Sequence, residues 1–185
     1  MHRRELLRAF GAATALSILP HDAFAAWSRV ARAERVTGGL NAAHSALVTA
    51  LADTILPRTD TPSATDVGVP AFIDVYVADY FNEAERAVFL AGLERIDDRS
   101  RHFTGRTFAD ASPEWRGEII TSIEADDRRT ELGRAYWRVK ELTVHGYFTS
   151  EPVMKNVLHY EVMPGRFDGD VVVPVRAERG GSNDA

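Results

Sequence analysis

Apolar residues recur at three- and four-residue steps along most of the chain, the spacing that gathers them on one face of an α-helix. The pattern is clearest over 40–56, and Pro57 ends this predicted helix because proline cannot continue it. The residues that share its apolar face are Leu40, Ala43, Leu47, Val48, Leu51 and Ile55.

Two more helices are marked by the residues at their starts. Pro70 fits the first turn of a predicted helix over 70–81. Asn82, with Glu85 three residues later, resembles a capping box, so the next helix is predicted over 83–99. The apolar side of this second helix would consist of Val88, Phe89, Ala91, Leu93 and Ile96.

Ser112 and Pro113 begin another predicted helix, because serine is a good N-cap and proline fits the first helical position. Its buried face would hold Trp115, Ile119, Ile120 and Ile123. A further helix is predicted over 130–147, with Leu132, Tyr136, Val139, Leu142 and Thr143 on one stripe.

No run of alternating strands separates these helices. The sequence therefore predicts an all-α fold, a small irregular domain of about four to six helices with long loops. Its C-terminal segment is expected to be extended, and 171–175 could form one short edge strand.

The segment 57–70 is dense in proline, threonine and aspartate, which predicts a loop. Its three prolines favour a rigid surface connection. Asp60 and Asp66, with neighbouring hydroxyl groups, could instead bind a cation, but their spacing lacks the order of a calcium-binding loop. We favour the structural interpretation.

The amino terminus has the layout of an export signal. Arg3 and Arg4 precede a moderately apolar run at 10–19, and Ala23 and Ala25 form a small-x-small cleavage site. The paired arginines resemble a twin-arginine signal, which implies export to the periplasm. The apolar run is too short to span a bilayer. The alternative is an amphipathic first helix of a cytosolic protein.

These patterns divide the chain into a twin-arginine signal peptide at 1–25, a linker at 26–39, a helical domain at 40–175 and a disordered tail at 176–185. The segment 26–39 could instead be a frayed helix. At 185 residues, one domain with tails is the expected organisation.

Composition removes several classes of function. The formal net charge of −5 gives no general attraction to nucleic acid. The absence of cysteine excludes thiolate metal sites, iron–sulfur clusters, disulfides and cysteine nucleophiles. No glycine-rich nucleotide fingerprint, Walker loop or nucleophile elbow is present either.

The segment 142–171 is unusual because it combines aromatic residues with prolines and glycines. His145 and His159 lie in it and could meet in space, so a stand-alone periplasmic enzyme or a ligand-binding helical domain is one hypothesis for the chain. The histidines do not have the spacing of a metal site, and no nucleophile motif accompanies them. A site for docking another protein is the other hypothesis.

Four short motifs support the second hypothesis. Residues 52–57 read Ala-Asp-Thr-Ile-Leu-Pro, and 68–70 read Gly-Val-Pro. Residues 146–150 read Gly-Tyr-Phe-Thr-Ser, and 164–167 read Pro-Gly-Arg-Phe. Together with the paired arginines, and in this order, they resemble the gluconate 2-dehydrogenase subunit 3 family.

The resemblance implies a non-catalytic small subunit with no cofactor of its own. Its partner would be a large dehydrogenase of the glucose-methanol-choline (GMC) type, which carries FAD and oxidises a sugar or alcohol, sometimes with a multihaem cytochrome c subunit. The small subunit would help the large one mature and escort it through twin-arginine export, and would meet the membrane only through the complex. The residues expected to bind the partner are Gly146, Tyr147, Phe148, Thr149, Ser150, Pro164, Gly165, Arg166 and Phe167.

Overall fold

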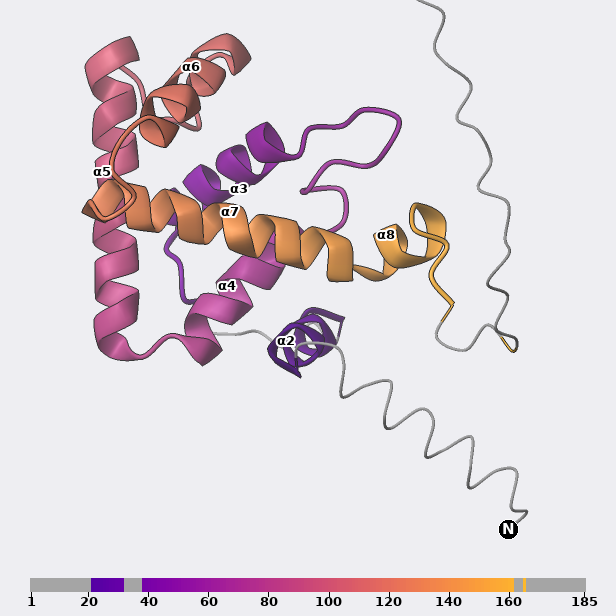
Figure 1. The fold of residues 1–185 in the computed structure, drawn as a ribbon. Coiled ribbons are helices and arrows are strands. Elements are labelled where there is room, and N and C mark those ends of the chain that lie inside the picture. The colour runs from indigo at the N-terminus through magenta and orange to yellow at the C-terminus, as the bar shows by residue number, and fades with distance from the viewer. Residues whose placement is uncertain (1–20, 32–37, 162–164, 166–185) are drawn as a thin grey trace, which may run out of the picture.

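Helices make up all the regular structure of the part of the chain that the structure describes, and the predicted all-α fold is confirmed (Figure 1). The structure is a computed structural model, and it describes residues 21–31, 38–161 and Gly165. The helices are α2 (His21–Ala31), α3 (Ala42–Ile55), α4 (Val69–Tyr80), α5 (Glu83–Thr104), α6 (Pro113–Glu124), α7 (Glu131–Thr149) and α8 (Glu151–Asn156).

The helix starts follow the predicted capping residues. The Asn82 side chain accepts a hydrogen bond from the Glu85 backbone N–H at 2.9 Å, and the Glu85 carboxylate accepts one from the Asn82 N–H at 3.0 Å. This reciprocal pair is the capping box expected from the sequence. At the start of α6, the Ser112 hydroxyl accepts a single hydrogen bond from the Trp115 N–H at 3.5 Å. The helix α5 runs further than predicted, to Thr104, where Gly105 ends it with a φ of 71°.

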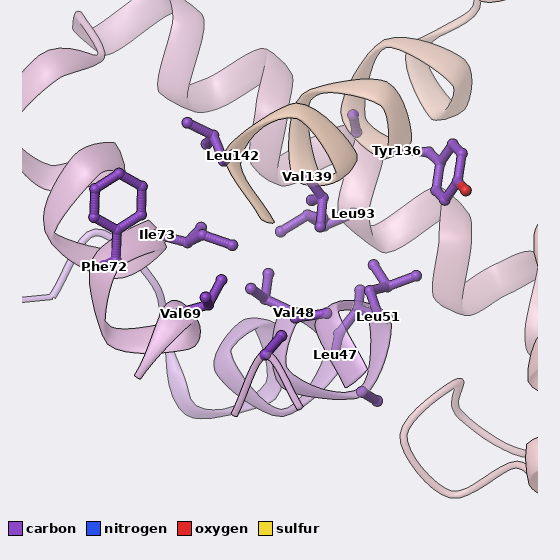
Figure 2. Close-up of a cluster of buried hydrophobic side chains, with 14 of the residues drawn as sticks. Leu47, Val48, Leu51, Val69, Phe72, Ile73, Leu93, Tyr136, Val139 and Leu142 are labelled. Carbon is purple, nitrogen blue, oxygen red and sulfur yellow. The ribbon is translucent and has the colours of Figure 1, made fainter. Parts of the chain in front are cut away.

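One hydrophobic core joins the described helices, and the first turns of α7 cross α5 at one side of it (Figures 1 and 2). Figure 2 shows side chains from α3, α4, α5 and α7 converging on this core. Gly92 permits the close crossing, because a Cβ atom there would lie 2.5 Å from the Cβ of Ala135. Across the core, Gly146 of α7 sits against the ring of Phe72 in α4.

The helix α2 is part of the packed domain and runs across the predicted boundary between signal and linker at residue 25. Ala23 and Ala26 are buried, and Trp27 stacks on Phe72 with 5.2 Å between ring centroids. Arg29 forms an ion pair with Asp79 of α4. Residues 26–31, for which both a linker and a frayed helix were expected, are helical and contact the core.

The loop 57–68 is held in place by hydrogen bonds. The Asp66 carboxylate accepts one from the Ser63 backbone N–H at 2.7 Å and pairs with Arg58, and these contacts hold the pKa of Asp66 below its usual value. The Tyr147 hydroxyl of α7 donates to the Pro62 carbonyl at 2.9 Å. These contacts agree with the structural interpretation of the loop.

Four positions of the predicted apolar faces lie on the surface instead: Ala43 of α3, Val88 and Ala91 of α5, and Trp115 of α6. Val88 and Trp115 are among the exposed large apolar residues. Each continues an apolar stripe in the sequence, but the described helices leave it exposed. The predicted edge strand at 171–175 and the tail at 176–185 lie outside the described residues.

Candidate partner-binding surface

The first group of predicted contact residues, 146–150, forms the C-terminal end of α7. Gly146 is buried, and a Cβ atom there would come within 2.7 Å of the Phe72 ring. Tyr147 is only 5% exposed. Phe148 differs from both, because it is 46% exposed. Of these three residues, Phe148 alone is available to another protein.

Thr149 and Ser150 also make internal contacts. The Thr149 hydroxyl accepts a hydrogen bond from the indole N–H of Trp27 at 3.1 Å and donates one to the His145 carbonyl at 2.7 Å. Ser150 is buried, and its hydroxyl donates to the Tyr147 carbonyl at 2.7 Å. The motif that carried the resemblance thus holds α2, α7 and the 57–68 loop together.

The second predicted group, Pro164 to Phe167, falls mostly outside the described residues. Gly165 is described: it is exposed and has a φ of 74°, a conformation that glycine adopts readily. Pro164, Arg166 and Phe167 lie outside the described part of the chain, as do Arg3 and Arg4 of the predicted signal.

Ala23 and Ala25 of the predicted cleavage site lie in α2. Ala23 is 2% exposed and faces the core, whereas Ala25 is exposed. Processing after Ala25 would remove Ala23 from the core and shorten α2 by its first turn.

His145 and His159 occupy different surroundings. The His145 ring stacks on Phe72, with 6.1 Å between centroids, and its Nε2 atom is buried without a hydrogen-bond partner among the described residues. His159 is exposed after α8 and has a φ of 49°. No group of three metal-ligating side chains occurs in the described ranges. The structure gives the two histidines no shared hydrogen bond or ion pair within those ranges.

A surface groove lies between α5 and α7 and had not been predicted. Its volume is about 460 Å³, and its lining is mostly apolar. Phe81, Phe89 and Ala135 line its inner part, where Phe81 and Phe89 pack edge to face with 5.3 Å between centroids. Ala84 and Val88 of α5 form one wall, and Val88 is 48% exposed.

The opposite wall of the groove is basic. Arg134 and Arg138 stand four residues apart on α7, so they share one face of that helix. Arg138 pairs with Glu141 at 2.8 Å, and its guanidinium lies 5.2 Å from the centre of the Phe81 ring. Arg134 is exposed and makes no ion pair with any described residue.

A sequence signal for this groove exists, but it is weak. The pairs Ala84–Val88 and Arg134–Arg138 each have the four-residue spacing of one helix face. That the two faces border the same groove depends on the crossing of α5 and α7, which no local pattern reveals.

These features define the chain as a small all-α protein with an open, basic-walled groove on its surface. Residues 42–165 match the family model described as gluconate 2-dehydrogenase subunit 3. The chain therefore belongs to the gluconate 2-dehydrogenase subunit 3 family, whose name describes an accessory subunit of a multi-subunit gluconate dehydrogenase complex.

Two other comparisons gave nothing further: no curated protein and no solved structure matched the chain. Within the described residues, no helix combines the length and apolar character needed to cross a membrane.

Proposed function

We propose that this chain is the non-catalytic small subunit of a periplasmic dehydrogenase complex, and that it binds, helps mature and exports the large subunit. The large subunit would be a GMC-type flavoprotein that carries FAD and oxidises the hydroxyl group of a sugar or alcohol. A multihaem cytochrome c could accept its electrons. The observation that carries the proposal is the family match over 42–165.

Features of the chain support an escort role. A twin-arginine signal carries folded cargo, and a signal on one subunit can serve a bound partner that has none. The helix α2, which follows the paired arginines in the sequence, packs on α4 and α7 through Trp27. A signal joined to this helix would be fixed to a folded domain.

Co-expression tests the binding and maturation steps. The small chain purified alone should be colourless, whereas the two chains together should copurify as a yellow complex that reduces an electron-accepting dye. Without the small chain, the large subunit should be inactive or lack FAD. Normal flavin content and activity of a large subunit made alone would contradict the maturation role.

Replacing Arg3 and Arg4 by lysine tests the export step. The double variant should leave both subunits in the cytoplasm while the complex still forms and reduces dye in cell extracts. Unchanged periplasmic levels of both chains would contradict twin-arginine export. The binding role would still be tested by copurification.

A further inference from the structure

The groove between α5 and α7 has two chemically different walls. Ala84 and Val88 supply methyl groups on the α5 side, and Arg134 and Arg138 supply guanidinium groups on the α7 side. An occupant that satisfies both walls must be apolar along one edge and anionic along the other. A segment of protein with apolar side chains and flanking carboxylates has this chemistry.

Arg134 is the cation of the groove that no described residue pairs with. Glu85 also lines the groove, and its carboxylate stays negative while it accepts the capping-box hydrogen bond from the Asn82 N–H. Arg138 is paired with Glu141, while Arg134 has no ion-pair partner among the described residues. Arg134 therefore favours a carboxylate from outside.

The geometry of the groove is fixed before anything binds. Gly92 lies one turn beyond Val88 on α5, where a Cβ atom would come within 2.6 Å of the Glu131 carbonyl on α7. The two helices are therefore in direct contact at the end of the groove. A preformed groove lowers the entropy lost on binding. The exposed Val88 side chain is a ready apolar contact at its edge.

We propose that the groove between α5 and α7 is the docking site for an apolar segment of the large dehydrogenase subunit, with a carboxylate on that segment pairing with Arg134. The proposal rests on the proposed function, because it assigns that function's partner to a defined surface. Val88 is the apolar anchor, and Arg134 is the charge that selects an acidic edge.

The test is the affinity between the large subunit and variants of the full-length small chain, measured with the purified subunits. Val88→Asp should weaken binding by about tenfold or more, because it places a carboxylate in the apolar wall. Phe103→Asp is the matched control, since Phe103 is on the same helix and is equally exposed, at 48%, but lies outside the groove. The control should bind like the wild type.

Charge reversal tests the basic wall independently. Arg134→Glu should also weaken binding by about tenfold, and should make the remaining affinity less sensitive to salt. Arg106→Glu, on the exposed loop after α5, is its control. Circular dichroism checks that each variant is folded, and the milder Val88→Gln replaces Val88→Asp if that variant is not.

Three results would overturn the docking site. The first is wild-type affinity in both groove variants. The second is equal loss of affinity in the variants and their controls. The third is concentration-dependent dimerisation of the small chain that Val88→Asp abolishes, which would identify a second copy as the occupant. If the wild-type chains do not bind each other at all, the proposed function itself fails, and this outcome is distinct from the other three.

Discussion

Gly92 sets the distance between α5 and α7. A Cβ atom at this position would lie 2.5 Å from the Ala135 Cβ and 2.6 Å from the Glu131 carbonyl oxygen, so the helices would have to separate to accept a side chain. The carbonyl belongs to the backbone and cannot turn aside as a flexible side chain can. The absence of a side chain at this one position is what allows this helix pair to pack.

We therefore expect Gly92→Ala to destabilise the domain by about 1 to 3 kcal/mol, even though alanine is the better helix former. Gly117→Ala is the control: Gly117 is also helical, but nothing lies within 4 Å of the added Cβ. That variant should gain about 0.5 to 1 kcal/mol. Urea unfolding measures both, and equal effects of the same sign would contradict the packing argument.

Glu124 makes a pH-dependent contribution to stability. Lys140 at 2.6 Å and the Tyr136 hydroxyl at 2.5 Å both bind its Oε1 atom, and these contacts hold the pKa of Glu124 below its ordinary value of 4.5. Because the folded state favours the ionised form, the stabilisation is present above pH 4.5 and is lost as the pH falls through the lower, folded-state pKa.

Glu124→Gln should accordingly lower the urea midpoint at neutral pH. The difference from the wild type should shrink as the pH falls from 4.5 through the lower folded-state pKa, because the wild-type carboxylate in the folded protein then becomes neutral too. Glu118→Gln, at an exposed position of the same helix, serves as the control. A difference that stays constant down to strongly acidic pH would show that the contacts of Glu124 do not depend on its charge.

At the scale of elements, Trp27 contacts several parts of the domain from α2. The indole ring stacks on Phe72 and closely approaches Gly68, and its N–H donates to the Thr149 hydroxyl. The contacts reach α4, the end of the 57–68 loop and α7. This single side chain therefore connects α2 to three parts of the domain.

Trp27→Phe should keep the ring contacts but lose the hydrogen bond, at a cost of about 1 kcal/mol in the free energy of unfolding. Trp27→Ala should lose both and cost about 2 to 4 kcal/mol. Trp115→Ala, at an exposed tryptophan of α6, should change stability little. Equal losses for the two alanine variants would mean that α2 does not contribute to the stability of the folded domain.

The helix starts could be predicted from the sequence because their causes are local. Asn82 and Glu85 stand three residues apart, and the same three-residue spacing produces their reciprocal hydrogen bonds. The helix α2 could not be predicted in the same way, because the small residues at 23–26 also fit the cleavage region of an export signal. Its position depends on contacts with α4 and α7, which are distant in the sequence.

At the scale of the whole molecule, the same distinction applies to the candidate site. The motif 146–150 is one of four on which the family resemblance rests, yet Gly146, Tyr147 and Ser150 are buried in the core of the chain. In the sequence, a motif that stabilises the fold cannot be distinguished from a motif that binds a partner. The groove, by contrast, is built by two helices whose crossing becomes visible only in the folded chain (Figure 1).

The hydrogen bond from Trp27 to Thr149 spans 122 residues, which has a consequence for the order of events during synthesis. Trp27 leaves the ribosome long before Thr149 does. The residues that α2 packs against are therefore not all present until nearly the whole domain has been made. In the proposed role, we expect the export signal to be joined to a docked helix only in finished chains. Truncated nascent chains would carry the same signal on an α2 that is not yet packed on the domain. The order of synthesis would therefore distinguish incomplete chains from folded cargo.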